Sequence, residues 1–205
     1  MSWQVPQLWT GEVAAIFGGG PSLNQLDVDM VKWSGIRRIA VNNAYWFDLE
    51  ADLLCWGDIR WWLDNKSDVK RHIGMKVTWI HSPEEPGIKF YELAKQKEPA
   101  PSISRHAGLI QGSNTGHGAI NLAYLLGVKK ILLLGFEMKI GSKNNFHTRH
   151  TRHANAERYA NVFIPEMARS AGELRSLGVE VINCTPDSAL TCFPMRTLEE
   201  ALGGL

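Results

Sequence analysis

The sequence predicts an α/β fold with a Rossmann-like, doubly wound and mostly parallel sheet. Short apolar runs of strand length alternate along the chain with stretches of helical character. Four of these runs end directly in glycine or asparagine, as strands do where they lead into a turn. The run at 131–135 is uninterrupted by polar residues, which is typical of a central strand buried on both faces.

The same alternation gives the expected elements in chain order. Pro83, Pro86, Pro99 and Pro101 break the periodicity between 82 and 107, so we expect a connection there with one short helix at 89–96. Expected strands lie at 12–17, 36–41, 51–56, 76–80, 131–135 and 179–184. Expected helices lie at 26–33, from about residue 59, at 119–126 and at 156–177, where Pro165 bends or delays the helix, with a closing turn at 198–202.

Composition narrows the class of protein. The 205 residues are expected to form one domain, with 44% hydrophobic and 21% charged residues, close to globular averages. A net charge of +1 argues against a surface that coats nucleic acid, and three widely spaced cysteines form neither a disulfide framework nor a CxxC clamp. We find no secretory signal and no apolar stretch of about 20 residues, so a cytoplasmic protein without a membrane span is expected.

The glycine run after the first expected strand is the first feature that carries chemistry. Gly18, Gly19 and Gly20 are followed by Pro21 and Ser22, which fit the first turn and cap of a short helix. Glycines let backbone N–H groups approach a phosphate or sugar closely. The run is neither GxGxxG nor a Walker loop, and a tight turn without a ligand is an equal alternative.

Polar side chains also follow the second and third expected strands. Asn42 and Asn43 offer donors and acceptors for a ribose hydroxyl or a base edge, with local turn formation as the alternative. Asp58 is a candidate for a hydroxyl or a metal, and the capping of the helix that begins near Ile59 is slightly favoured. Ligands in open α/β sheets bind beyond the carboxyl ends of strands, which favours binding roles.

A second small-residue turn spans 112–118. Ser113, Thr115 and Gly116 precede an apolar helix, and such a helix start can bind an anion through its free N–H groups. His117 belongs to the same turn and is expected to be a surface histidine. The segment therefore predicts a second contact with a nucleotide.

The segment 139–155, which we call the lid, is polar, basic and rich in histidine. His147 and His150 are candidates for a general base, and Arg149 and Arg152 for contacts with phosphate. Three histidines at a spacing of three do not share one helical face, and no cysteine or carboxylate is interleaved with them. A phosphate clamp with a catalytic histidine is therefore expected rather than a metal site, with a solvated basic loop as the alternative.

Taken together, these motifs resemble those of the bacterial CMP-sialic acid-dependent sialyltransferases. The glycine-Pro-Ser loop also resembles that of the MptE-like domain of 6-hydroxymethylpterin diphosphokinases, and the whole layout is similar to small proteins of phages and prophages. The resemblance lies in residues 18–23, 42–43, 115–116, 126–131 and 134–137, and, for the phage proteins, in the end segment 181–190.

The resemblance to the sialyltransferases implies roles for particular residues. It implies nucleotide contacts at Gly19, Gly20, Ser22, Asn42, Asn43, Thr115 and Gly116, with His147 or His150 as the base. The family's paired lid tyrosines, which contact the donor phosphate, have no clear match in the sequence, so Arg149 or Arg152 would replace them. The acceptor-binding region is also shorter, and a preference for sialic acid is not implied.

The expected function is transfer from a nucleotide-activated donor, a CMP- or UDP-type sugar, by a glycosyltransferase. A modified DNA base is one expected acceptor, and a homo-oligomer is compatible with the tryptophan content. The first alternative is diphosphate transfer from ATP, which would need Mg²⁺ on Asp58 and Glu137. The second is a nucleotide-binding module without catalysis.

Overall fold

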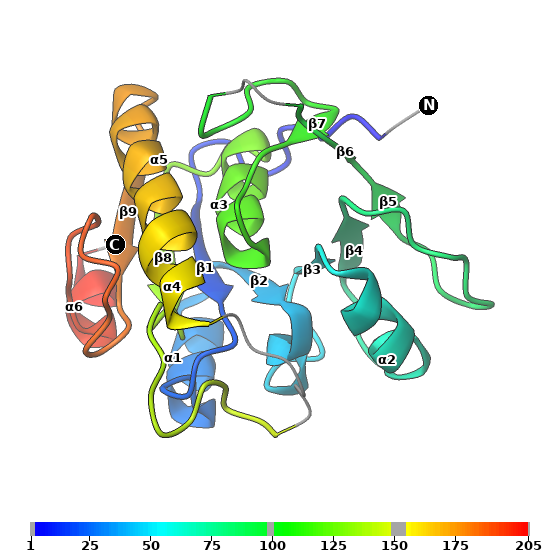
Figure 1. Ribbon diagram of the computed structural model, residues 1–205, viewed down its shortest axis with the longest axis horizontal. Coiled ribbons are helices and arrows are strands. Elements are labelled where there is room, and N and C mark those ends of the chain that lie inside the picture. Colours follow the sequence, from blue (N-terminus) through cyan, green and yellow to red (C-terminus); the bar gives the residue numbers. More distant parts are fainter. Residues whose placement is uncertain (1–2, 98–100, 149–154, 205) are drawn as a thin grey trace.

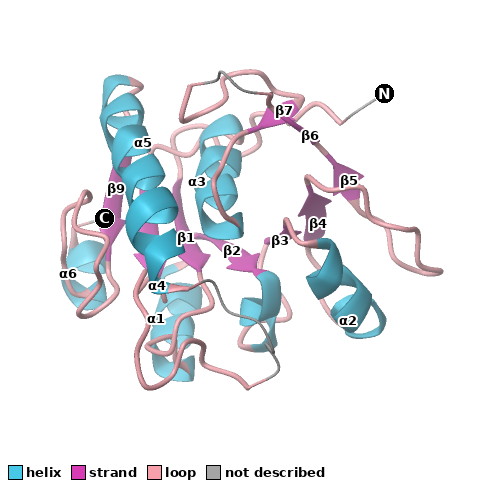
Figure 2. Cartoon of the chain, viewed as in Figure 1, coloured by secondary structure: helices cyan, strands magenta, loops and turns pink. Residues whose placement is uncertain are grey.

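The computed structural model describes residues 3–97, 101–148 and 155–204, and it contains a seven-stranded sheet in the order β5-β4-β3-β2-β1-β8-β9. All neighbouring strands of this sheet pair in parallel. The strands are β1 (Val13–Phe17), β2 (Arg37–Val41), β3 (Leu53–Trp56), β4 (Met75–Thr78), β5 (Tyr91–Glu92), β8 (Lys130–Leu134) and β9 (Glu180–Asn183). The predicted α/β, mostly parallel sheet is confirmed (Figures 1 and 2).

Helices lie on both faces of the sheet. They are α1 (Gln25–Ser34), α2 (Ile59–Val69), α3 (Thr115–Leu125), α4 (Ala156–Arg158), α5 (Ile164–Ser176) and α6 (Leu198–Gly203), with a 3₁₀ turn η1 (Asn42–Trp46) and a π turn η2 (Tyr159–Phe163). The expected long helix at 156–177 is thus α4, η2 and α5 in succession. Pro165 lies in the first turn of α5 and has no N–H to donate, and the π turn comes directly before it.

The expected short helix at 89–96 is wrong. The chain instead forms β5, which pairs with β4, and then β6 (Ala94–Lys95), which pairs in parallel with β7 (Leu109–Ile110). Leu93 lies between β5 and β6, is buried, and donates its N–H to Thr78 O at 2.8 Å. Pairing with strands distant in sequence therefore overrides the weak local helical preference.

Two hydrophobic clusters show that the sheet is doubly wound. Alternate residues of β1 enter different clusters: Ala14 and Ile16 join one, and Ala15 and Phe17 join the other. The first cluster contains buried residues of α3 and α5, and the second those of α1, α2 and α6. Each face of the sheet is therefore covered by its own set of helices.

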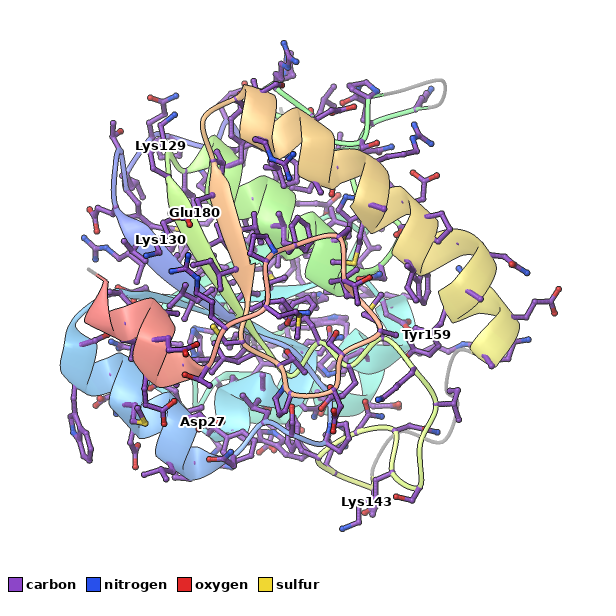
Figure 3. All side chains as sticks on the ribbon, turned by 90° about the vertical axis from the view of Figure 1, so that its left-hand side faces the viewer. Asp27, Lys129, Lys130, Lys143, Tyr159 and Glu180 are labelled. Atoms are coloured by element: carbon purple, nitrogen blue, oxygen red, sulfur yellow. The ribbon has the colours of Figure 1, made fainter. Side chains whose placement is uncertain are left out.

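The strand order creates a topological switch point at β1. From β1 the chain proceeds through β2, β3 and β4 in one direction, and it returns to β8 and β9 on the other side. In Figure 3, Tyr159 and Lys143 lie toward one end of the sheet and Lys129, Lys130 and Glu180 toward the other. Ligands of such sheets bind at the carboxyl ends of the strands that flank the switch point. In the described parts of the chain, no helix has the length and apolar character needed to cross a membrane.

Candidate functional site

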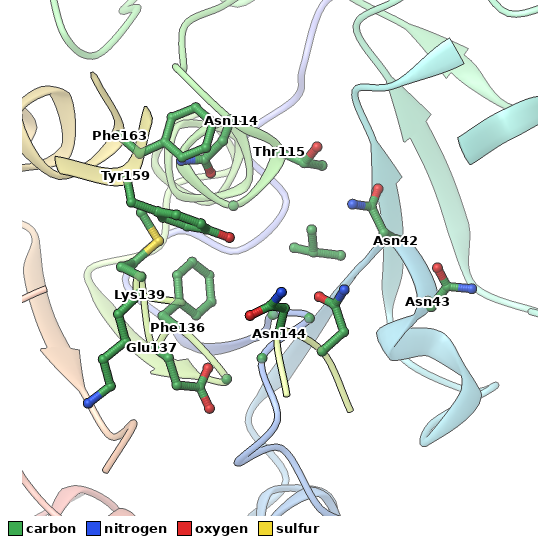
Figure 4. Close-up of a pocket in the computed structure, with 18 of the residues that line it drawn as sticks. Asn42, Asn43, Asn114, Thr115, Phe136, Glu137, Lys139, Asn144, Tyr159 and Phe163 are labelled. Carbon is green, nitrogen blue, oxygen red and sulfur yellow. The ribbon is translucent and has the colours of Figure 1, made fainter. Parts of the chain in front are cut away.

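A cavity of about 200 Å³ lies at the carboxyl ends of β1, β2 and β8, at the switch point (Figure 4). It brings together most of the predicted site residues that the structure describes. These are Gly18, Gly19, Gly20, Asn42, Asn43, Thr115, Gly116 and His147. Of the described residues, Ser22, Asp58 and Ser113 were also predicted but do not line the cavity. Arg149, His150 and Arg152 lie outside the described residues.

The glycine loop uses its N–H groups within the protein. The N–H of Gly18 donates to Leu134 O at 2.7 Å, and the N–H of Gly20 donates to Gly135 O at 3.0 Å. The N–H of Ser22 donates to Glu137 Oε1 at 2.6 Å. These bonds join the loop after β1 to the turn after β8. The N–H groups at these three positions, which we expected to be free for a ligand, are therefore bonded within the protein.

Glycine is required at position 20 because the loop and Glu137 approach each other closely. A Cβ on Gly20 would overlap the Glu137 carboxylate and would lie 2.7 Å from Gly135 O. The backbone is left-handed at Gly135 (φ 73°) and at Met138 (φ 52°), so the chain folds back on either side of Glu137. This turn sets the Glu137 side chain beside the glycine loop (Figure 4).

Glu137 is the most unusual polar group in the cavity wall. Only 9% of its surface is exposed, and its Oε1 accepts the Ser22 N–H. Its second oxygen, Oε2, is buried and has no hydrogen-bond partner within the described residues. The only role that the sequence analysis predicted for Glu137 was as a ligand for Mg²⁺ in the diphosphate-transfer alternative. Its contact with Ser22, which lies 115 residues away, is a product of the fold.

The two asparagines at the end of β2 have different environments. Asn43 is buried: its Oδ1 accepts from Trp61 Nε1 at 2.7 Å, and its Nδ2 donates to Asn65 Oδ1 at 3.0 Å. Asn42 has a left-handed backbone (φ 53°), and its Oδ1 is buried without a partner among the residues described. In Figure 4, the Asn42 amide extends toward the cavity and the Asn43 amide extends away from it. The Asn42 Oδ1 thus lacks a hydrogen bond within the described residues, and the Asn43 amide joins η1 to α2.

The start of α3 presents backbone donors to the cavity. Asn114 caps the helix, and its Oδ1 accepts the N–H of His117 at 2.9 Å. Thr115 and Gly116 are the first two helical residues, whose N–H groups have no acceptor within a helix, and both line the cavity. A Cβ on Gly116 would lie 2.6 Å from the Phe136 ring. Glycine therefore lets the helix start pack against this ring.

The expectation of a surface histidine at position 117 is wrong. His117 is 1% exposed, and its Nδ1 accepts the N–H of Ser113 at 3.2 Å. Burial lowers the pKa of His117 from its ordinary 6.5 to about 4, so the ring is neutral at pH 7. The helix start turns this side chain inward, which local sequence does not reveal. Ser113 therefore donates its N–H to His117 and does not line the cavity.

The described part of the lid lies over the glycine loop. Phe146 donates its N–H to Gly19 O at 3.2 Å, and its ring packs on Phe47 with centroids 4.8 Å apart. The His147 ring lies 5.0 Å from the Trp46 ring and is half-buried at the cavity. One of the two predicted base candidates is thus at the site.

Tyr159 is a site residue that the sequence analysis missed. It is half-buried in η2 and lines the cavity (Figure 4). Burial, and to a lesser extent the charge of Glu137, raises the pKa of its phenol, which therefore keeps its proton and can donate it in a hydrogen bond. Its position just after the lid, before an expected bend at Pro165, was the available signal.

Asp58 has the capping role that was slightly favoured. Its Oδ1 accepts the N–H of Arg60 at 2.8 Å at the start of α2. In the described ranges, His, Cys, Asp and Glu side chains form no group of three or more that could hold a metal ion. Glu137 lines the cavity and Asp58 does not, so the two carboxylates do not share one site.

Comparison with known proteins bears on the fold. The chain is similar to the sialyltransferase CstII from Campylobacter jejuni, solved in complex with a substrate analogue, cytidine-5'-monophosphate. The TM-score is 0.53 at 11% sequence identity, over 91% of this chain and 85% of that chain. The fold is sialyltransferase-like. No family model and no curated protein matches the chain. The resemblances to the pterin diphosphokinases and to phage proteins stay predictions.

Proposed function

We propose that the chain is a glycosyltransferase that binds a nucleotide-activated sugar, of the CMP or UDP type, in the cavity at the switch point. One observation carries the proposal: the cavity joins the start of α3, the unpartnered Asn42 amide oxygen of the described structure and a histidine at a single place. The fold shared with a sialyltransferase that was solved with CMP supports a nucleotide as the ligand.

The start of α3 is the proposed site for the donor phosphate. The N–H groups of Thr115 and Gly116 and the positive end of the helix dipole favour an anion there. The protonated Tyr159 hydroxyl at the same cavity can add a hydrogen bond to the departing phosphate. Arg149 and Arg152 remain proposed phosphate ligands.

His147 is the proposed general base, with His150 as the alternative. The acceptor hydroxyl would lose its proton to the imidazole while its oxygen forms a bond to the sugar. The bond between the sugar and the phosphate oxygen then breaks, and the nucleotide departs with the electron pair. Such a base contributes about 10²–10⁴-fold in rate. A hydroxylated base in DNA is one proposed acceptor.

A thermal-shift screen tests the donor class. CMP, UMP, UDP, GDP, ADP and ATP, and the sugar conjugates, are added with Mg²⁺ or with a chelator. A ligand at 100 times its Kd should stabilise the protein by roughly 2.7 kcal/mol. Stabilisation by a pyrimidine nucleotide in chelator supports the proposal. Stabilisation by ATP alone, and only with Mg²⁺, would favour diphosphate transfer instead.

Turnover of the donor found in that screen tests the base. His147→Ala is expected to lower kcat by about 10²–10⁴-fold with little change in donor affinity. His81→Ala is the matched control, since the His81 side chain is 91% exposed and belongs to a different segment. If His150→Ala alone abolishes turnover, His150 is the base. Donor binding without turnover by the wild-type chain would favour a binding module.

A further inference from the structure

The lid residues Asn145, Phe146 and His147 are divided between two environments. Asn145 and His147 line the cavity. Phe146, between them, packs against the hydrophobic cluster that contains the buried residues of α1, α2 and α6. The lid is therefore attached to the core by one side chain and presents the two neighbours of that side chain to the cavity.

Phe146 is held by two aromatic rings and one backbone bond. Its ring centroid lies 4.8 Å from that of Phe47 and 6.2 Å from that of Trp46, with interplanar angles of 61° and 84°. Such edge-to-face geometry is favourable for aromatic pairs. The N–H of Phe146 donates to Gly19 O at 3.2 Å. These contacts attach the described part of the lid to η1 and to the glycine loop.

The turn that carries Trp46 is itself fixed by the core. Tyr45, the residue before it, is fully buried, and Asn43 is hydrogen-bonded to α2. The N–H of Phe47, the residue after it, donates to Ala44 O at 3.1 Å. The backbone of Trp46 is therefore held on both sides, and its indole can restrict a side chain that packs against it.

Trp46 packs against His147 as well as against Phe146. The ring centroids of Trp46 and His147 are 5.0 Å apart, with an interplanar angle of 58°. The described wall of the cavity contains His147 and does not contain Trp46, so the indole contacts the imidazole from outside the ligand space. A general base has to lie within hydrogen-bond reach of the proton that it removes. A contact that limits the rotation of the imidazole therefore favours one direction for this base.

We propose that Trp46 is a positioning residue, which holds the His147 imidazole toward the acceptor hydroxyl and makes no contact with the donor. The inference rests on the proposed function, in which His147 is the base. It assigns to the aromatic contact between η1 and the lid a role in the rate of transfer and none in donor binding.

Turnover and donor affinity of the Trp46→Leu variant separate these two effects. The variant should lower kcat by about 10- to 100-fold, because misplacement of a catalytic group by about 1 Å can cost the larger of these factors. The donor Kd, measured by calorimetry, should stay within about threefold of the wild-type value, because uniform binding is not removed. Trp46→Phe keeps an aromatic ring against His147 and should restore most of the lost turnover.

A double variant distinguishes positioning from a general loss of structure. Substitutions of residues that act as a unit are not additive. If Trp46 acts through His147, Trp46→Leu should lower kcat no further in a chain that already carries His147→Ala. A further loss of about tenfold or more in the double variant would overturn the proposal.

Trp33→Leu is the matched control. Trp33 is 80% exposed near the end of α1, which leads to the amino end of β2, and it is therefore remote from the cavity. This variant should keep the wild-type kcat and donor Kd. A loss of kcat in Trp33→Leu as large as that in Trp46→Leu would overturn a specific role for Trp46.

Nuclear magnetic resonance of the histidine ring protons tests the contact without turnover. The His147 signals are identified by their absence from the spectrum of His147→Gln. The ring current of an indole at 5.0 Å affects them, so they should shift in Trp46→Leu, and those of the exposed His81 should not. In the wild-type chain, cross-relaxation should connect the ring protons of His147 and Trp46, which keeps the proposal falsifiable if the variant does not fold.

The outcomes separate this inference from the proposed function. Absence of that cross-relaxation, or an unchanged kcat in Trp46→Leu, would overturn the positioning role and leave the transferase intact. Weaker donor binding with an unchanged kcat would overturn it as well, since Trp46 would then shape the donor site. Failure of the wild-type chain to turn over any nucleotide-sugar donor would overturn the proposed function, and the ring-proton spectra would still decide whether Trp46 orients His147.

Discussion

The two ends of the parallel sheet differ in how their carboxylates are paired. At the amino end, Arg37 pairs with Glu12 at 2.6 Å and with Asp52 at 3.1 Å, and Arg38 pairs with Asp48 at 2.7 Å. At the carboxyl end, Asn42 Oδ1 and Glu137 Oε2 are buried without partners among the described residues. In the described structure, the amino end also contains unpartnered buried atoms, Nδ1 and Nε2 of His72, so the two ends differ in the pairing of their carboxylates rather than in the presence of buried polar atoms.

The difference separates charges paired within the fold from polar atoms that have no partner among the described residues. Buried polar groups are normally hydrogen-bonded, so unpartnered ones mark a place where something else binds or where strain is retained. The left-handed backbone at Asn42 and Met138 lies at the same end. Substitutions of the paired charges at the amino end should therefore change stability, and substitution of Asn42 at the carboxyl end, whose Oδ1 is unpartnered in the described structure, should change binding.

The largest expected effect is at the amino end. The Asp48 side chain is fully buried, with Arg38 at 2.7 Å and Lys32 at 3.7 Å. Asp48→Ala should lower the free energy of unfolding by about 3–5 kcal/mol, because it leaves a partly buried arginine without its partner. Urea denaturation measures this. Glu50→Ala should change it by less than about 1 kcal/mol, since the Lys32–Glu50 pair is exposed. Equal losses of stability in Asp48→Ala and Glu50→Ala would contradict the importance of the buried pairs at the amino end.

Acid should destabilise the fold through buried histidines. Burial, with Lys76 second, lowers the pKa of His72 from 6.5 to about 4, and the residue is 1% exposed. Between these values the unfolded chain binds a proton that the folded chain does not, so stability falls as the pH decreases from 6.5 to 4. The loss should reach roughly 3 kcal/mol at pH 4.

Urea denaturation at pH 7, 5.5 and 4.5 measures this loss. His72→Gln should flatten the dependence, and His81→Gln, at an exposed position, should not. His117, at the other end of the sheet, has the same depressed pKa of about 4 and should contribute a similar slope. A wild-type chain equally stable at pH 7 and 4.5 would contradict the prediction for both histidines.

The adjacent asparagines test the comparison within the site. Asn43→Ala should cost about 1–3 kcal/mol of stability, because it leaves Trp61 Nε1 and the Asn65 amide without their partner. Asn42→Gly keeps the left-handed backbone and removes the amide. It should leave stability within about 1 kcal/mol and weaken nucleotide binding by roughly tenfold. A loss of binding in Asn43→Ala together with a loss of stability in Asn42→Gly would contradict the roles assigned to the two asparagines.

Two glycines give expected effects on stability of opposite sign. Gly20→Ala should destabilise the fold by about 1–3 kcal/mol and weaken nucleotide binding, since its Cβ would overlap Glu137. Gly172→Ala lies in α5, where no described atom outside its own helix backbone and chain neighbours comes within 4 Å of the added Cβ, and it should stabilise by about 0.5–1 kcal/mol. Thermal denaturation with and without nucleotide distinguishes the two. A stabilising Gly20→Ala would refute the tight approach to Glu137.

Apolar patterning carried most of the fold prediction. The strand expected at 131–135 is β8, and the one expected at 12–17 contains β1, because uninterrupted apolar runs of this length are stable when buried on both faces. The helix predicted at 89–96 was wrong because β5 and β6 each contain only two residues, and their pairing with β4 and β7 decides their structure. Local preference has little influence on elements so short.

The sequence by itself determined the sheet, its turns and the end of the sheet at which polar side chains gather, because hydrophobic period and glycine position are local properties. Only the tertiary structure decided how these side chains are used. It paired Ser22 with Glu137, turned His117 inward, separated the roles of Asn42 and Asn43, and brought Tyr159 to the cavity. These are contacts between groups set in place by packing, and neither composition nor spacing encodes which side of a turn a side chain takes.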